Sequence, residues 1–140
     1  QMVALIRMAV FAKEPQNLTA YCGGKRDERF TDIIEMTYTN GMCLQKVRQN
    51  GNVLHLTLRT WWINYSEING KIVKTGDLID ATFAKNVARR ETPGFSITSV
   101  NCHSCGGSFD AVRQRNCPYC GTEYRMEDDY WVIEDMKLVR

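Results

Sequence analysis

The stretch that decides the fold is Val53-Leu-His-Leu-Thr-Leu-Arg-Thr-Trp-Trp-Ile-Asn-Tyr65. Its residue types favour a strand, and its side chains alternate as they do in a strand with one buried face. The face that we expect in the core carries Leu54, Leu56, Leu58 and Trp62, and the opposite face carries His55, Thr57, Arg59, Trp61 and Tyr65.

Turn signals around this strand predict a β-meander. Asn-Gly pairs stand at positions 40, 50 and 69, and this dipeptide favours the tight turns of hairpins. We therefore expect strands over residues 42–48, 53–65 and 82–90, with Phe83 and Val87 on one side of the third and with Phe95 and Ile97 as a candidate extension. Residues 130–139 alternate in the same way and close the sheet, with Val132, Met136 and Leu138 on one side and Trp131, Ile133 and Asp135 on the other.

The N-terminal segment predicts short helices. Residues 2–12 form a broad apolar face at helical spacing, composed of Val3, Leu5, Ile6, Met8, Ala9, Val10 and Ala12. After a break at residues 14–17 we expect one or two further turns, ended by Gly23-Gly24, with Leu18, Tyr21 and Cys22 facing inward. Residues 25–29 are charged and predict a solvated connection.

The whole chain is consistent with one globular domain that carries a small appendage. It has 140 residues, of which 44% are hydrophobic and 24% charged, and a formal net charge of +2 that gives no strong attraction to nucleic acid or anionic membranes. The longest apolar run is too short to span a bilayer. Because the sequence begins with Gln1, we expect a fragment whose anchor or targeting segment was removed, located in the cytoplasm or on the cytoplasmic side of a membrane.

Two CxxCG motifs predict a metal site. They are Cys102-His-Ser-Cys105-Gly-Gly and Cys117-Pro-Tyr-Cys120-Gly-Thr, and a short hairpin brings such motifs together around one ion. Each glycine permits a positive φ, which lets backbone N–H groups turn back toward the thiolate sulfurs. Four thiolates fill a tetrahedral zinc ion, so the prediction is one structural Zn²⁺ in a zinc ribbon.

Three other chemistries suit paired cysteines: two short-range disulfides, a redox CxxC motif and an iron–sulfur cluster. The CxxC spacing favours zinc in a reducing compartment. His103 lies inside the first motif and is interpreted as a solvated bystander, whereas Cys22 and Cys43 are expected to be inert core thiols.

The ribbon is predicted to span residues 101–129, inserted before the last strand of a domain made of residues 1–100 and 130–140. Its charges argue against nucleic-acid binding, because three arginines stand against five carboxylates and the zinc tetrathiolate adds further negative charge. These residues are Arg113, Arg115 and Arg125 against Asp110, Glu123, Glu127, Asp128 and Asp129.

A family resemblance rests on four segments: the hairpin over residues 41–65, the wide turn Asn69-Gly-Lys-Ile-Val-Lys-Thr-Gly-Asp77, the strand ending Ala88-Arg-Arg-Glu-Thr-Pro93, and the closing Asp129-Tyr-Trp-Val-Ile-Glu134. From about Asp32 onward, the chain resembles the C-terminal domain of the mitochondrial inner-membrane translocase subunit Tim-forty-four and its bacterial relatives, which are similar also in an inserted zinc ribbon. The resemblance implies a curved antiparallel sheet packed on helices, a cone related to nuclear transport factor two and cystatin. The long upstream helical region of that family is reduced here to about thirty residues.

Three functions are weighed against one another. The leading hypothesis is a non-catalytic adaptor that binds a protein, as the soluble part of a membrane-associated protein with a transport or assembly role; Trp61 and Tyr65 are its candidate partner surface. The second is an enzyme with a small-molecule pocket, in which His55 acts as a base with Asp77 or Asp80 nearby. The third is a nucleic-acid-binding zinc ribbon.

Overall fold

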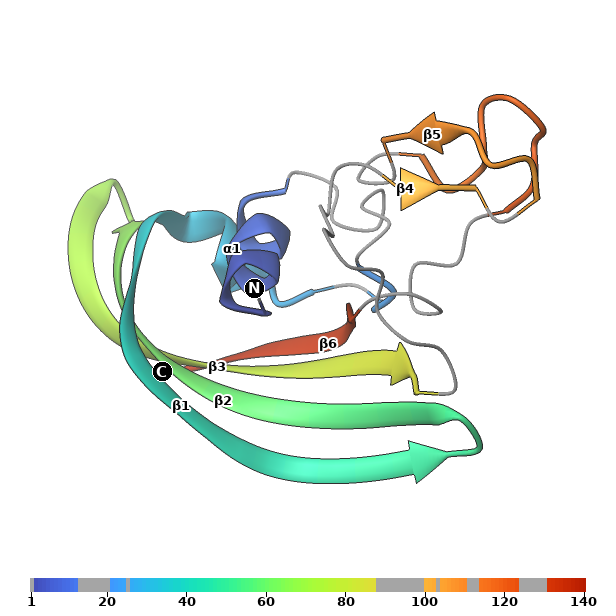
Figure 1. Ribbon diagram of the computed structural model, residues 1–140. Coiled ribbons are helices and arrows are strands. Elements are labelled where there is room, and N and C mark those ends of the chain that lie inside the picture. Colours follow the sequence, from blue (N-terminus) through green and yellow to red (C-terminus); the bar gives the residue numbers. More distant parts are fainter. Residues whose placement is uncertain are drawn as a thin grey trace.

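The computed structural model describes residues 2–12, 21–24, 26–87, 100–102, 104–110, 114–123 and 131–140. Its elements follow one another along the chain as α1 (Met2–Phe11), the 3-10 helix η2 (Glu28–Asp32), β1 (Ile33–Asn50), β2 (Val53–Ile68), β3 (Lys71–Asn86), β4 (Val100–Asn101), β5 (Ser108–Phe109) and β6 (Val132–Val139) (Figure 1). The expected α+β class is confirmed as a curved antiparallel sheet with one short N-terminal helix.

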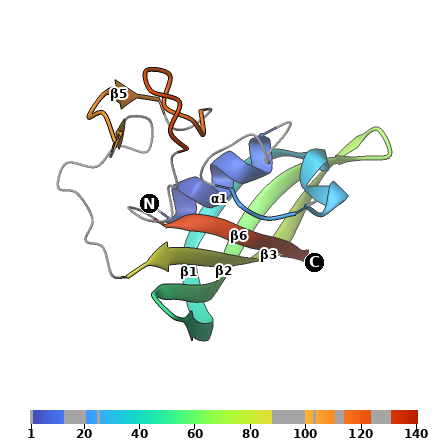
Figure 2. The same cartoon turned by 90° about the vertical axis from the view of Figure 1, so that its right-hand side faces the viewer.

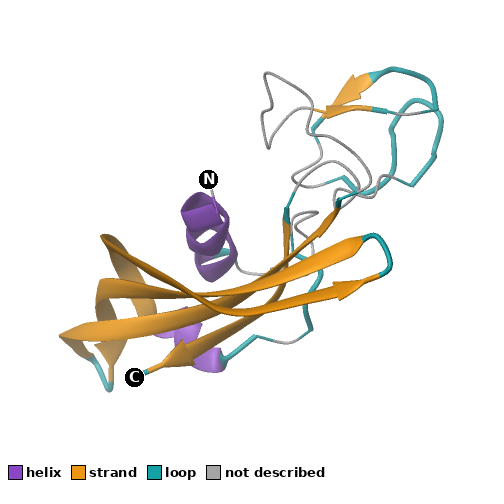
Figure 3. Ribbon diagram, turned by 60° about the horizontal axis from the view of Figure 1, so that its bottom comes forward, coloured by secondary structure: helices purple, strands orange, loops and turns teal. Residues whose placement is uncertain are grey.

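The sheet has four strands in the order β1-β2-β3-β6, and every neighbouring pair is antiparallel. Strands β4 and β5 form a separate two-stranded sheet, which lies away from the large sheet on the side where α1 also lies (Figures 1 and 3). The strand predicted over residues 53–65 is confirmed and continues to Ile68.

The chain reverses at two of the three predicted Asn-Gly turns, with Gly51-Asn52 as the turn residues of the first hairpin and Asn69-Gly70 as those of the second. The turn predicted at Asn40-Gly41 is wrong. Asn40 lies inside β1 with a φ of 66°, and the pairing register jumps there from Tyr38–Trp62 to Gly41–Trp61. The pair therefore forms a bulge, whose positive φ Asn tolerates well, and a bulge bends its strand. Strand β1 consequently begins at Ile33, well before the expected residue 42.

The predicted wide turn over residues 69–77 is also wrong. Asn69 and Gly70 have φ values of 52° and 76°, which makes a two-residue turn of the kind that joins twisted strands directly. Strand β3 therefore begins at Lys71, eleven residues before the expected start. The structure places its end at Asn86, Val87 follows in a turn, and residues 88–90, Phe95 and Ile97 lie outside the described residues.

The core lies between α1 and one face of the sheet, called here the inner face (Figure 2). The prediction of a buried N-terminal helix is confirmed, and its buried residues are Leu5, Ile6, Ala9 and Val10. From the sheet, Trp62, Ile79 and Phe83 are fully buried. Leu58 and Trp62 confirm the predicted core face of β2, whereas Leu54 and Leu56 are only half-buried because α1 lies nearer the other end of the strand (Figure 1).

The predicted helical turns before Gly23 are wrong in their described part. Tyr21 forms a parallel bridge with Ile133, and the Cys22 N–H donates to the Ile133 carbonyl at 2.7 Å. Neighbouring side chains of an extended segment point to opposite sides, so Tyr21 is buried while Cys22 is exposed. Cys43 is exposed as well, so neither cysteine is the core thiol that we expected. Leu18 lies outside the described residues.

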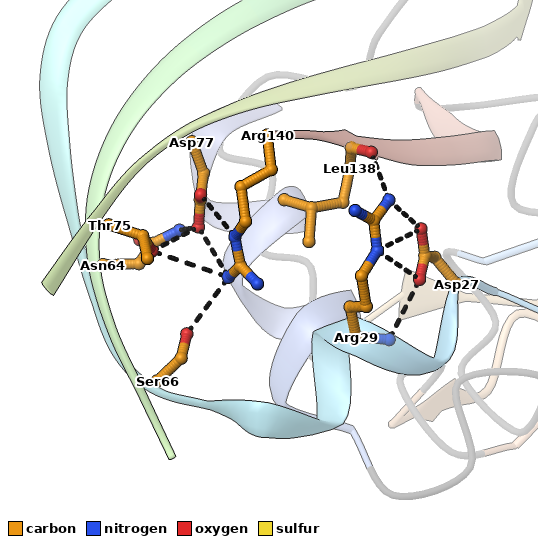
Figure 4. Close-up of polar contacts among 8 residues, drawn as sticks. All are labelled: Asp27, Arg29, Asn64, Ser66, Thr75, Asp77, Leu138 and Arg140. Carbon is orange, nitrogen blue, oxygen red and sulfur yellow. Dashed lines mark hydrogen bonds and ion pairs between the residues drawn. The ribbon is translucent and has the colours of Figure 1, made fainter. Parts of the chain in front are cut away.

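A polar cluster interrupts the inner face (Figure 4). The buried Asp77 carboxylate accepts hydrogen bonds from Arg140 Nε at 2.8 Å, Asn64 Nδ2 at 2.8 Å and Thr75 Oγ1 at 3.0 Å. Burial raises the pKa of the Asp77 carboxyl, but these hydrogen bonds and the Arg140 charge outweigh burial and hold the pKa below its ordinary value. The cluster thus joins β2 and β3 to the residue that follows β6.

Candidate metal centre

The first cysteine motif folds into a tight loop. The Cys102 N–H donates to the Gly107 carbonyl at 2.9 Å, and the Gly106 N–H donates back to the Cys102 carbonyl at 2.9 Å. Gly106 has a φ of 76°, as expected for the glycine after Cys105, and this left-handed residue directs the Gly107 N–H to the Cys105 sulfur. The Ser104 N–H points at the Cys102 sulfur, with N and Sγ 3.4 Å apart.

The second motif repeats this geometry. The Cys117 N–H donates to the Thr122 carbonyl at 2.9 Å, and the Gly121 N–H donates to the Cys117 carbonyl at 2.9 Å. Gly121 also has a φ of 76°, and the Thr122 N–H reaches the Cys120 sulfur. The expectation that each CxxCG glycine turns a backbone N–H toward a thiolate is therefore confirmed in both motifs.

The four sulfurs converge on one point. Cys102 Sγ lies 3.7 Å from Cys120 Sγ, Cys105 Sγ lies 3.6 Å from Cys117 Sγ, and all four lie within 4.8 Å of one another. A tetrahedral ion with metal–sulfur bonds of about 2.3 Å places its ligands about 3.8 Å apart. A disulfide would need sulfurs about 2.0 Å apart. The four cysteines can therefore hold one metal ion, and their geometry is not that of two disulfides.

The sulfurs differ in how readily they lose a proton. Hydrogen bonds from the Thr122 hydroxyl and backbone N–H lower the pKa of Cys120 to about 6, and backbone N–H groups of Cys105 and Ser104 lower the pKa of Cys102. The Gly107 N–H favours the Cys105 thiolate, but the adjacent Cys117 sulfur and burial outweigh it and raise the pKa of Cys105 to about 11. A bound cation favours the thiolate form of every ligand, so metal binding must release protons here.

The two loops pack against each other and against the rest of the chain. A Cβ at Gly107 would lie 2.6 Å from the Tyr119 ring, so the absence of a side chain at Gly107 lets that ring lie against the first loop. Phe109 in β5 is buried. Arg115 Nη2 donates to the Tyr21 carbonyl at 3.2 Å, which connects the ribbon to the segment that bridges β6. His103 and the charged residues Arg113, Arg125, Glu127, Asp128 and Asp129 lie outside the described residues.

The candidate partner residues lie on the outer face of the sheet, opposite the core. Trp61, Ile63 and Tyr65 occupy three successive outward positions of β2, and each is 38% exposed. We call these three residues the aromatic stripe. Sequence reasoning placed Trp61 and Tyr65 on the face opposite to Trp62, and the burial pattern agrees.

His55 has a carboxylate neighbour that the sequence did not reveal. Its Nδ1 is hydrogen-bonded to Glu134 Oε2, and Arg48 Nη2 lies 3.6 Å from Glu134 Oε1. The expected neighbours belong elsewhere, since Asp80 pairs with Arg59 at 2.8 Å and Asp77 points to the inner face. Glu134 stands at a register shift between β3 and β6, and only the strand order brings it near His55, so no sequence spacing signals the contact.

Comparisons with known proteins leave the family open. No family model, no curated protein and no solved structure matches the chain. Among the helices that the structure describes, none is both long enough and apolar enough to cross a membrane.

Proposed function

We propose that the chain is a non-catalytic adaptor domain that binds another protein and is stabilised by one structural zinc ion. The observation that carries the proposal is the closed set of four sulfurs, because a tetrahedral ion held by Cys102, Cys105, Cys117 and Cys120 keeps no position for substrate or water. Zinc is the ion that prefers such a thiolate set in structural sites.

The zinc assignment is tested by elemental analysis of protein purified without added metal. We expect about one zinc per chain, and we expect Cys105→Ser to lose both the metal and the amide protection of residues 100–102, 104–110 and 114–123. Cys43→Ser is the matched control, since Cys43 is an exposed cysteine outside the cluster, and it should keep the metal. Purified protein that contains iron, or two oxidised cysteine pairs, would refute the assignment.

The aromatic stripe is the proposed contact with the partner. Large aromatic side chains dominate protein interfaces because they bury much apolar area for few rotatable bonds, and here two of them flank Ile63 on a solvated face. We expect Trp61→Ala and Tyr65→Ala to remove proteins that the wild-type chain captures from its host. Phe11→Ala is the control, because Phe11 is similarly exposed but lies on α1. An unchanged set of captured proteins in all three variants would contradict the stripe as interface.

The resemblance to the Tim-forty-four family supports a more specific version of this proposal. In it, the sheet is a cone of the nuclear transport factor two and cystatin type, and the domain is the cytoplasmic part of a membrane-associated protein with a transport or assembly role. Fractionation of the full-length tagged protein tests the location. Recovery in the soluble fraction at low salt would contradict membrane association.

The His55–Glu134 pair supports an enzyme as the second candidate. A carboxylate on Nδ1 orients an imidazole so that Nε2 can accept a proton, as in many general bases. Hydrolysis of a panel of small esters and phosphate esters by the wild-type chain, abolished in His55→Gln and retained in Lys71→Gln, would favour this candidate. Equal rates in the wild type and His55→Gln would dismiss it.

A further inference from the structure

The two edges of the large sheet differ in how many of their outward backbone groups have hydrogen-bond partners. At the β6 edge, the Cys22 N–H donates to the Ile133 carbonyl, and Arg29 Nη2 donates to the Leu138 carbonyl at 2.8 Å. At the β1 edge, Arg7 Nη2 from α1 donates to the Met36 carbonyl at 3.3 Å. Residues 42–50 of β1 continue along that edge. They pair with β2 on one side, and on the other side no strand among the described residues pairs with them. We call residues 42–50 the open edge.

The side chains of the open edge extend the core beyond its covered part. Met42, Leu44 and Val47 lie in register with Thr60, Leu58 and Leu56, and so belong to the inner face. Their exposed fractions are 43%, 54% and 56%, whereas Leu58 beside them is buried. These three residues form an apolar strip, one strand wide, that continues the hydrophobic inner face and is not covered as the core is.

The backbone of the same residues points away from the sheet. A two-residue turn, Gly51-Asn52, joins β1 to β2, so its closing pair Asn50–Val53 is hydrogen-bonded and the pairs alternate from there. Gln49 and Val47 then direct their N–H and C=O groups outward. A second register shift in β1 lies between Leu44 and Lys46, and beyond it Leu44 and Met42 direct these groups outward as well. Met36 also has its side chain on the inner face, and its carbonyl, which accepts from Arg7, points outward from the edge in the same way.

The charges beside the apolar strip select the partner. Lys46 and Arg48 lie on the outer face of the open edge, and Arg48 Nη2 lies 3.6 Å from Glu134 Oε1. Residues 36–66 contain no acidic residue that could neutralise Lys46. A second copy paired through this segment would bring like charges together on one face, which destabilises strand pairs. Edges that are protected against pairing commonly point a charge into the apolar face, and the strip has none.

We propose that the open edge binds an extended segment of another protein, in which acidic residues alternate with apolar ones. The segment adds as a fifth strand next to β1. Its apolar side chains cover Met42, Leu44 and Val47, and a carboxylate of the segment meets Lys46. This surface is distinct from the aromatic stripe, which faces the other side of the sheet.

A fluorescein-labelled nine-residue peptide of alternating Glu and Val is the probe. We expect saturable binding by fluorescence anisotropy, and we expect the amides of Leu44 and Val47 to exchange hydrogen at least ten-fold more slowly in the complex. A peptide with Lys in place of Glu should bind at least ten-fold more weakly. The same acidic peptide with alternate amides N-methylated, along either of its edges, should also bind at least ten-fold more weakly. N-methylation retains the side chains but blocks strand pairing, so the loss would show that the backbone contributes to binding.

Variants of the chain complete the test. Lys46→Glu should weaken binding of the acidic peptide about five- to ten-fold, as expected for reversing one cross-strand charge pair, and should gain affinity for the lysine peptide. Lys71→Glu makes the same charge change away from the edge and should bind normally. Trp61→Ala should also bind normally, so failure of the aromatic stripe and failure of this inference are separable. The proposal would be overturned if the N-methylated peptide bound as tightly as the unmodified one, or if Lys46→Glu left the affinity for the acidic peptide unchanged. Protection of the same amides by self-association of the chain would also overturn it.

Discussion

Arg140→Gln is expected to destabilise the domain through the buried Asp77. Arg140 forms two close contacts with that carboxylate, Nε to Oδ1 at 2.8 Å and Nη2 to Oδ2 at 3.1 Å. Removing one partner of a buried ion pair typically costs about 3–5 kcal/mol, because the remaining charge stays out of water. Asn64 and Thr75 still donate to Asp77 after the change, so we expect about 2–4 kcal/mol, measured by urea unfolding at pH 7.

The pH dependence of this difference gives the more specific test. The folded-state pKa of Asp77 is depressed, so its stabilising contribution is present above the unfolded-state pKa of about 3.9 and is lost as the pH falls through the folded-state value. In Arg140→Gln, burial acts without the cation, and protonation of Asp77 relieves the unpaired charge. The gap in unfolding free energy between wild type and variant should therefore narrow as the pH falls from 5 toward 2.

Comparing the two proteins at each pH cancels the titration of carboxylates whose pKa does not depend on Arg140. The titration of Asp27 cancels only in part, because its pKa is lowered mainly by the hydrogen bonds of Arg29 but also by the charge of Arg140. The double variant Asp77→Asn, Arg140→Gln removes both charges and should cost less than the single change. A gap that is constant or widens at low pH would refute the reasoning, as would a cost below about 0.5 kcal/mol at pH 7.

Four further predictions follow from local geometry and from the metal. Gly70→Ala places a side chain at a φ of 76° and should cost about 1–2 kcal/mol in urea unfolding, whereas Gly76→Ala has open space around the added Cβ within β3 and should be nearly neutral. Gly23→Ala should cost about 1–3 kcal/mol, since its Cβ would lie 2.7 Å from the Glu134 carbonyl oxygen. Trp62→Phe removes a buried hydrogen bond to Thr60 Oγ1 of 2.7 Å and should lower the unfolding free energy by about 1–3 kcal/mol in thermal scans. A zinc chelator should release hydrogen-exchange protection in the ribbon while the amides of β2 and β3 stay protected; simultaneous loss in both would contradict a locally acting metal.

Local patterns predicted the parts of the fold whose cause is local. The alternation along residues 53–65 predicted β2 and its buried face because successive side chains of a strand point to opposite faces of the sheet. The CxxCG motifs predicted the four-cysteine cluster because the loop geometry is determined within six residues, as the matching hydrogen bonds of both loops show. The apolar face of residues 2–12 found α1 for the same reason.

Features that depend on distant pairing were missed. Asn40-Gly41 has the sequence of a hairpin turn, but the strands on both of its sides pair with one partner, β2, so the backbone bulges and does not reverse. The start of β3 at Lys71 has no strong alternation, and pairing with the long β2 makes it a strand. Glu134 meets His55 across β3 because the intervening residue in register with His55 is Ala84, whose small side chain leaves the space.

The contacts that cover one edge of the large sheet connect the four-cysteine cluster to the rest of the domain. The Tyr21-Cys22 segment covers the β6 edge at Ile133, and the ribbon holds this segment from the other side through Arg115 and the Tyr21 carbonyl. If the four cysteines bind the proposed metal, the ordered ribbon would support this edge of the sheet, where an exposed strand would invite pairing with other chains. At the opposite edge, residues 42–50 have no such cover among the described residues, and their apolar and basic side chains alternate in register. Within the part of the chain that the structure describes, the sheet is thus covered at the edge next to the four-cysteine cluster and uncovered at the edge that we assign to a partner.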